Sequence, residues 1–188
     1  MEETISYTEP LRRLVHLIRI AGRFRLAGDQ TQGQTMEISD KDIKALFLSL
    51  NKHRVQYMLV GGFAVNIYGY HRTTNDIALW VKEGDENMDK LIRALQEIGI
   101  PGAEHLKGNK LVPGFTELTF GMNNFRIDLM NYLNAFREAD FDEVYERALS
   151  AEFAGVPFQV IHKDDLLREK RAAGRHKDLD DLEHLTNK

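Results

Sequence analysis

The segment from residue 55 to residue 81 places the strongest constraint on the fold. It opens with the apolar run VQYMLV, which ends on Gly61 and Gly62, and it continues with FAVNIYGY and DIALWVK. A short apolar run bounded by glycines is typical of a buried strand; the second piece has helical spacing and the third is again strand-like. The sequence therefore predicts a strand–helix–strand unit with two glycines at its first junction.

Helices and strands alternate along the rest of the chain. Ser39 and Asp40 are good N-caps for a helix that runs to about His53, and apolar spacing predicts a second helix over 85–99. Further on, we expect a helix over 134–149, a strand at VPFQVI, and a strongly helical segment from Asp164.

The runs FTELTF and FRIDLM predict two more strands. Gly121 and the Asn123–Asn124 pair stand between them, and this spacing favours a hairpin. Strands mixed with helices, with an internal hairpin, predict an α+β or mixed α/β fold in which helices flank a mixed central sheet and the C-terminal segment is helical.

The first 35 residues differ from the rest of the chain. Apolar residues at roughly helical spacing, interspersed with arginines, lead into a polar, glycine-containing stretch over 28–35. A new structural unit is expected to begin near Met36. We interpret 1–35 as a helical arm and linker and 36–188 as the domain. A sharper hypothesis is that the arm docks on a partner or on nucleic acid.

Composition narrows the classes of partner and compartment. The formal net charge of −4 creates no overall basic field, so binding to nucleic acid would depend on local patches. The chain has no cysteine, which excludes disulfides and thiolate chemistry. No apolar run is long enough to span a membrane, and the first residues lack the pattern of a secretory signal. We expect a cytoplasmic protein without a membrane partner.

Asp76 opens the strand DIALWVK, and residues two apart on a strand share a face. A second carboxylate at position 78 would point into the same site, where such a pair could hold magnesium. Position 78 is occupied by Ala78, whose methyl group is no ligand. The glycines at 61 and 62 allow a close backbone approach to phosphate, although a plain turn explains them equally well.

Asp128 lies between apolar residues in FRIDLM, on a strand expected to neighbour the one that carries Asp76. Burying a lone carboxylate is costly unless it is paired or binds a metal. Asp128 is therefore a metal-ligand candidate. The alternative is a structural carboxylate satisfied by backbone amides or by Arg126.

Taken together, Gly-Gly, a helix, an acidic strand and a later single aspartate resemble the polymerase-β nucleotidyltransferase superfamily. The stretch VGGFAVNIYGYHRTTNDI is most similar to the small bacterial branch of AbiEii-like abortive-infection toxins, and the resemblance covers 36–186. It implies a nucleotidyltransferase fold, phosphate binding by Gly61 and Gly62, and Mg²⁺ binding by Asp76 and Asp128. It also implies that position 78 should be aspartate.

The C-terminal run LLREKRAAGRHKDLDDLEHL fits the same resemblance, which favours Lys170, Arg175 and Lys177 as nucleotide ligands, with Asp178 orienting one of them. The alternative is a solvated amphipathic helix with charge pairs four residues apart. Arg72, just before the acidic strand, is a further phosphate candidate that could instead brace Asp76.

The resemblance implies a metal-dependent enzyme that transfers a nucleoside monophosphate from a nucleoside triphosphate to tRNA or protein, in a toxin–antitoxin or phage-defence setting. A cognate antitoxin or toxin and a second copy of the chain are the implied protein partners. Ala78 predicts a weak or inactive catalyst. The intact surroundings favour an introduced substitution over a natural pseudoenzyme that only binds. A non-catalytic antitoxin module and an aminoglycoside-type nucleotidyltransferase remain as alternative functions.

Overall fold

The computed structural model describes residues 40–74, 76–120, 125–153 and 155–186. The expected arm over 1–35 lies outside them. In the described part, six strands form one mixed sheet in the order β3-β4-β2-β1-β6-β5. The strands are β1 (Tyr57–Val60), β2 (Asp76–Val81), β3 (Glu117–Phe120), β4 (Phe125–Met130), β5 (Leu149–Phe153) and β6 (Val156–Val160). The predicted fold of mixed α and β structure, with a mixed central sheet, is confirmed.

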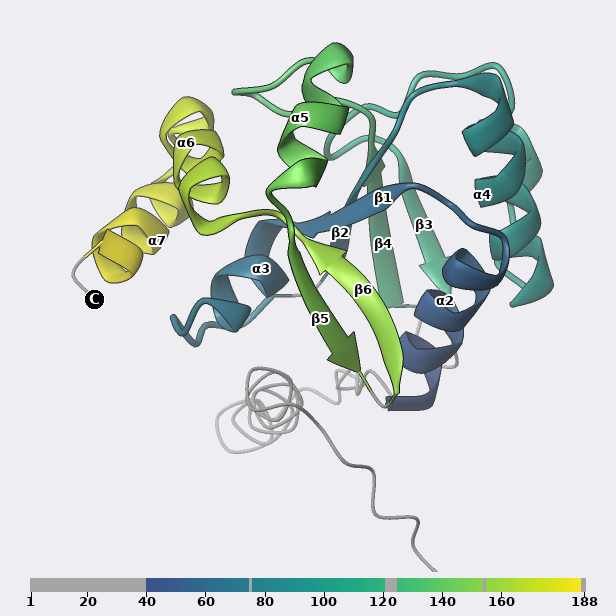
Figure 1. The fold of residues 1–188 in the computed structure, drawn as a ribbon, viewed down its shortest axis with the longest axis horizontal. Coiled ribbons are helices and arrows are strands. Elements are labelled where there is room, and N and C mark those ends of the chain that lie inside the picture. Colours follow the sequence, from purple (N-terminus) through teal and green to yellow (C-terminus); the bar gives the residue numbers. More distant parts are fainter. Residues whose placement is uncertain (1–39, 75, 121–124, 154, 187–188) are drawn as a thin grey trace, which may run out of the picture.

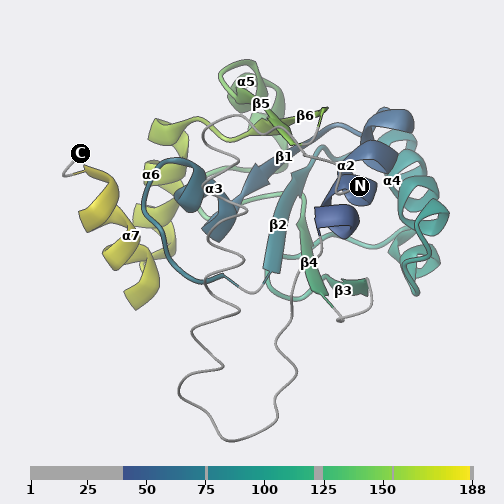
Figure 2. The ribbon, with the colours of Figure 1, turned by 90° about the horizontal axis from the view of Figure 1, so that it is seen from below.

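Helices cover both faces of this sheet. They are α2 (Asp40–Lys52), α3 (Gly61–Ile67), α4 (Asp85–Glu97), α5 (Phe141–Glu146), α6 (Lys163–Ala173) and α7 (His176–Thr186), with short 3₁₀ helices at Ala103–Leu106 and Glu138–Asp140. Figure 2 shows α2 and α4 on one side of the sheet and α6 and α7 on the other. None of the helices in the described ranges is long and apolar enough to cross a membrane.

Hydrophobic side chains pack on both faces of the sheet and form one core. On the α2 side, the Phe47 ring stacks on Phe158 and on Tyr57, at centroid distances of 4.6 and 6.1 Å. On the opposite face, the fully buried Trp80 packs edge-on against Phe141 of α5, 5.4 Å away. The alternation of side chains along a strand explains how β2, whose residues 77–81 are all buried, serves both layers.

The predicted hairpin is confirmed, because β3 and β4 pair antiparallel in the register Leu118 with Ile127. The helix predicted over 134–149 is too long. Within this range the structure has a 3₁₀ turn at Glu138–Asp140 and the short α5, and at its end Leu149 begins β5, which pairs antiparallel with β6. Hydrogen bonding to β6 overrides the helical spacing at Leu149. Figure 1 shows the β5–β6 hairpin extending from the sheet below α5.

The segment after residue 162 is helical, as predicted, but it forms two helices. Gly174 adopts φ 62° and caps α6 with a bond from its N–H to the Lys170 carbonyl. A left-handed residue at this position is the usual helix terminator, because glycine adopts it without a steric cost. The break turns α7 back against α6.

Candidate active site

The residues that the sequence predicted to bind metal or nucleotide all line one cleft. Its walls come from the start of α3, the segment leading into β2, a turn at residues 113–114, β4 with the loop after it, and the α6–α7 pair. The predicted residues that line it are Gly61, Gly62, Arg72, Asp76, Ala78, Asp128, Lys170, Arg175 and Lys177.

Strand register explains how the acidic residues meet. β2 and β4 are parallel neighbours, with Asp76 beside Arg126 and Ala78 beside Asp128. Asp76 and Ala78 share a face because they are two residues apart. Asp76, Ala78 and Asp128 all line the cleft, and Ala78 is 6% exposed. The methyl group of Ala78 thus lies at the position where a third carboxylate would complete the cluster.

Asp128 is buried without a cationic partner of its own among the described residues. Both of its carboxylate oxygens accept a hydrogen bond from the Gly114 N–H at 3.0 Å, while Arg126 pairs with Glu117 at 3.3 Å. Burial raises the pKa of Asp128 to about 6; the Gly114 bond opposes this rise and the charge of Asp76 adds to it. The carboxylate therefore titrates near neutral pH, the range that suits an acid or base in catalysis.

The two glycines are required by local geometry. Gly61 has φ 67°, and a Cβ there would lie 2.9 Å from the Cβ of Ala78. At Gly62 an added Cβ would lie 2.5 Å from the hydroxyl oxygen of Thr74. Any larger residue would clash at either position, so the backbone stays open along this edge of the cleft.

The opposite wall contains a chain of ion pairs, which we call the Lys170 network: Lys170, Asp178, Asp181, Arg72 and Arg175. The Lys170 Nζ atom lies 2.8 Å from both Asp178 and Asp181, and neither carboxylate is exposed. Arg72 donates to Asp181 at 2.9 Å, and Arg175 pairs with Asp178 at 2.6 Å. Burial alone would raise the pKa of Asp178, but the bonds from Arg175 and Lys170 hold it below its usual value.

This network changes the interpretation of two predicted ligands, Arg72 and Lys170. Arg72 braces Asp181 rather than Asp76, and Lys170 is occupied by two carboxylates. The solvated-helix alternative is wrong for Lys170, because only 3% of its surface is exposed. Lys177 is exposed, lines the cleft, and has no carboxylate partner among the described residues, so it is the cleft's available cation.

Several cleft residues were missed by the sequence reasoning. They are Thr74 before β2, Gly114 in the turn beside Asp128, Asn134 in the loop after β4, and Glu169 on α6. Glu169 is the neighbour of Lys170 on α6, but its place in the site depends on a contact with Asn134, 35 residues away, which local spacing does not contain. Asn134 and Gly114 lie in irregular segments, where spacing carries no signal.

Magnesium, which the resemblance implies, is not matched by a complete set of ligands. Within the described ranges, no group of three or more His, Asp or Glu side chains could hold a metal ion. Asp76 and Asp128 are the two carboxylates at the sheet, and the second titrates near pH 6. Magnesium prefers several anionic oxygens and releases its water reluctantly, so these side chains do not fit it.

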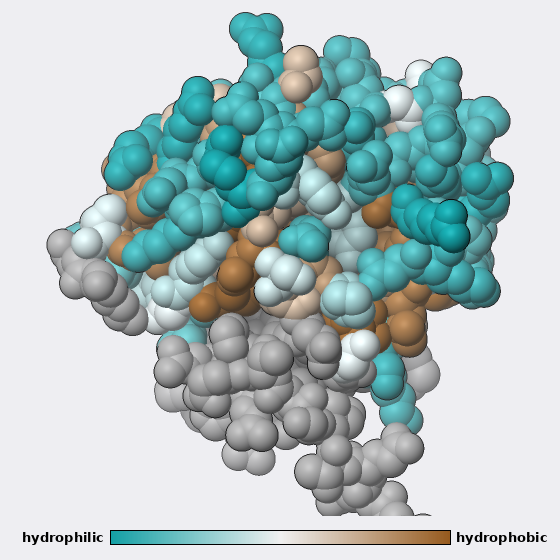
Figure 3. Space-filling model, in the orientation of Figure 1, coloured by the Kyte–Doolittle hydropathy of each residue, from teal (hydrophilic) through white to brown (hydrophobic). Residues whose placement is uncertain are grey.

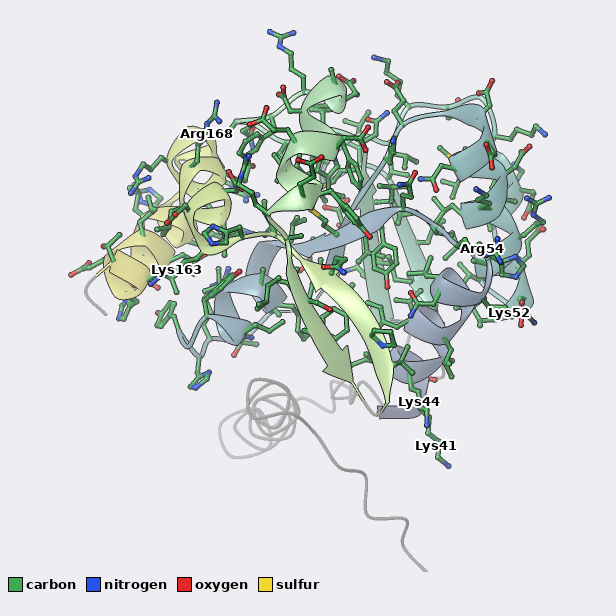
Figure 4. All side chains as sticks on the ribbon, in the orientation of Figure 1. Lys41, Lys44, Lys52, Arg54, Lys163 and Arg168 are labelled. Carbon is green, nitrogen blue, oxygen red and sulfur yellow. The ribbon has the colours of Figure 1, made fainter. Side chains whose placement is uncertain are left out.

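Other basic side chains in the described ranges do not extend the cleft into one basic groove. Figure 4 shows Lys41, Lys44, Lys52 and Arg54 on the α2 side, while Lys163 and Arg168 lie on α6. The guanidinium of Arg168 stacks over Phe136, 4.6 Å from the ring centroid.

In the space-filling view, hydrophilic residues cover the upper part of the face and hydrophobic residues gather lower down (Figure 3).

The fold is shared with solved nucleotidyltransferases. A Thermotoga maritima protein assigned as a nucleotidyltransferase superposes with a TM-score of 0.50 at 13% identity, covering 77% of this chain and 90% of that one. The lincosamide antibiotic adenylyltransferase LnuA, bound to lincomycin, gives 0.50 at 15% identity, covering 79% and 97%. The antibiotic-resistance factor ANT(2'')-Ia gives 0.52 at 13% identity, covering 79% and 82%. At these identities the likeness concerns the fold alone.

Sequence comparison gives the family. A search among curated proteins found no significant match. The family model described as "Nucleotidyl transferase of unknown function (DUF2204)" matches residues 39–188, a range that includes every residue the structure describes. The chain therefore belongs to this family of nucleotidyl transferases.

Proposed function

We propose that this protein binds a nucleoside triphosphate in the cleft and transfers its nucleotidyl group very slowly or not at all. Membership of a nucleotidyl transferase family supports the triphosphate as ligand. The exposed Lys177 and the open backbone at Gly61 and Gly62 offer phosphate a cation and a close approach.

One observation carries the catalytic half of the proposal. Ala78 lies beside Asp128 in the β2–β4 register and lines the cleft. The position that the superfamily resemblance assigns to an aspartate thus holds a methyl group, while the neighbouring geometry is kept. A carboxylate that acts only in the transition state is worth several kcal/mol, and each 1.4 kcal/mol changes the rate about tenfold.

The finer assignments of the sequence belong to the same proposal. The likeness of VGGFAVNIYGYHRTTNDI to AbiEii-like toxins supports a toxin–antitoxin or phage-defence role in the cytoplasm. The same likeness supports magnesium as the metal of an active form with aspartate at position 78, and tRNA or protein as the acceptor. It also supports a cognate antitoxin or toxin partner and self-association. Whether Ala78 was introduced or is natural, the expected biochemistry is binding without turnover.

A small-molecule acceptor is the second candidate. Two of the solved neighbours are an antibiotic adenylyltransferase and an antibiotic-resistance factor. The acidic lining residues Asp76, Asp128, Glu169 and Asp178 face an equal number of basic ones, Arg72, Lys170, Arg175 and Lys177. The charge of the cleft therefore favours neither a polyanionic acceptor nor a cationic one, and an acceptor assay has to decide.

The test restores a carboxylate at position 78. The Ala78→Asp protein and the unchanged protein are incubated with magnesium, labelled nucleoside triphosphates, and separate pools of RNA, protein and aminoglycosides. We expect labelling of one pool by Ala78→Asp at a rate roughly 100-fold or more above the unchanged protein. Ala78→Asn, which has the same shape without the charge, is the matched control and should remain inactive.

A further variant ties the gain to the site. Adding Asp76→Ala to Ala78→Asp should silence the protein again. If the unchanged protein labels an acceptor as fast as Ala78→Asp does, position 78 has no catalytic importance and the proposal fails. Equilibrium binding of a triphosphate to the unchanged protein tests the other half, and absence of binding would refute it.

A further inference from the structure

Part of the cleft lining differs in chemistry from the phosphate candidates. Four of its residues are apolar: Met130 and Leu133 at and after the end of β4, and Leu166 and Ala173 on α6. Apolar walls offer nothing to a triphosphate, but they suit the faces of a flat ring, as in most small-molecule sites.

A fixed polar pair lies among these apolar residues. The Asn134 side-chain amide donates to Glu169 Oε1 at 2.6 Å, and the backbone N–H of Ala135 donates to Glu169 Oε2 at 2.8 Å. Each oxygen of the Glu169 carboxylate is therefore held in place by one donor. A carboxylate oxygen has two lone-pair directions, so each retains an acceptor site for a ligand.

Glu169 disfavours phosphate beside it. A half-buried carboxylate repels phosphate oxygens, whereas Lys177 is an exposed cation of the cleft without a carboxylate partner among the described residues. Phosphate and ring would then occupy different parts of the cleft, with the triphosphate toward Gly61 and Lys177.

We propose that Glu169, positioned by Asn134, reads the nucleobase, and that it selects bases with an exocyclic amino group. This inference rests on the proposed binding of a nucleoside triphosphate. An ionised carboxylate only accepts hydrogen bonds, so the amino groups of adenine, cytosine and guanine satisfy it. Uracil instead presents carbonyl oxygens on both sides of its one ring N–H, and at least one of them faces the carboxylate unfavourably.

Cytidine and uridine triphosphates give the sharpest comparison, because they share the ribose and triphosphate and differ on the base edge. A hydrogen bond to a charged group favours the matched ligand by roughly 10- to 100-fold in affinity. We therefore expect the full chain to bind cytidine triphosphate that much more tightly than uridine triphosphate. Adenosine and inosine triphosphates should differ in the same direction, since inosine replaces the amino group by a carbonyl.

The experiment measures the four dissociation constants by titration calorimetry on the unchanged protein and on Glu169→Gln. Glutamine keeps the shape and one acceptor but adds a donor, so uridine triphosphate should bind more tightly and the cytidine-to-uridine ratio should fall below about threefold. The matched control is Glu146→Gln on α5, an exposed glutamate outside the cleft, which should leave the ratio unchanged.

Asn134→Ala is the second variant, and it avoids any doubt about folding because Asn134 is exposed. A positioning role predicts a smaller loss of discrimination than Glu169→Gln causes. If all four triphosphates bind alike, the base-reading inference falls and the proposed function stands. If the ratio survives Glu169→Gln, Glu169 is not the reader. If no triphosphate binds, both proposals fail together.

Discussion

Asp128 and Asp178 are both buried aspartates in the same cleft, yet their pKa values are shifted in opposite directions. The pKa of Asp128 is raised to about 6, while that of Asp178 is lowered. Burial removes both carboxylates from water, so the difference between their pKa values comes from their partners. Asp178 contacts two cationic side chains, whereas Asp128 accepts from a backbone amide and lies near Asp76.

The comparison separates two uses of buried charge. In the Lys170 network the protein neutralises its own carboxylates, and the result is a rigid wall that joins the segment before β2 to α7. At the sheet, Asp76 and Asp128 form no direct ion pair with a side chain in the described part of the chain, which leaves them able to bind a ligand from outside. A perturbed carboxylate in a cleft is thus better evidence for a functional site when its compensation is missing.

The largest test of this contrast is Lys170→Met. Removing one partner from a buried ion pair leaves uncompensated charge, and we expect a loss of about 3–5 kcal/mol in the free energy of unfolding, measured by urea denaturation. Lys82→Met is the matched control, because Lys82 pairs with the exposed Asp142 and its loss should cost less than about 1 kcal/mol. Similar effects for the two lysines would mean that burial of the network is unimportant.

Asp128→Asn should raise the free energy of unfolding at neutral pH, whereas Lys170→Met lowers it. Because the folded-state pKa of Asp128 is raised from 3.8 to about 6, the folded protein binds more protons than the unfolded chain between these values. The free energy of unfolding should then fall as pH rises through this window. Asparagine removes that slope and should stabilise the protein by about 2 kcal/mol at pH 7.

Chemical denaturation at pH values of about 4, 5, 6 and 7, which span this window, measures the slope for both proteins. The exposed Glu146→Gln should leave it unchanged. If Asp128→Asn destabilises the protein at neutral pH, the carboxylate is a structural acceptor, and the contrast with Asp178 disappears.

The smallest effect on stability is expected for Lys177→Ala. Lys177 is exposed and unpaired among the described residues, so the free energy of unfolding should change by less than about 0.5 kcal/mol. Affinity for a triphosphate should nevertheless fall several-fold, and more at low salt than at high salt. Arg171→Ala, an exposed α6 residue outside the cleft, should leave affinity unchanged.

Much of the fold follows from local patterns. The strand that ends on Gly61, the β3–β4 hairpin and the helices around 40–52 and 85–97 each have a short-range signal. β5 was missed because the helix was expected to end at residue 149 and no strand was expected after it. Only the pairing of Leu149 and Ala151 with Val160 and Phe158 of β6 makes this segment a strand. Such pairing is a tertiary effect that a local window does not contain.

The site was predictable to the extent that it uses strand alternation. Asp76, position 78 and Asp128 came from two-residue spacing and an apolar setting, whereas the partners of Lys170 did not. Nothing local in the sequence distinguishes Lys170, Asp178 and Asp181 from the other charged residues of the C-terminal segment. They meet only because the turn at Gly174 folds α7 back against α6. Glu169 and Asn134 were missed for the same reason, since their contact joins segments 35 residues apart.

The bond between Arg72 and Asp181 also has a consequence during translation. These residues are 109 positions apart, and the carboxylates that neutralise Lys170 belong to α7 as well. At 5–20 residues per second, roughly 5 to 20 seconds pass between the synthesis of Arg72 and that of its partner. Until α7 has left the ribosome, neither Arg72 nor Lys170 can form these ion pairs, so this wall of the cleft is completed last.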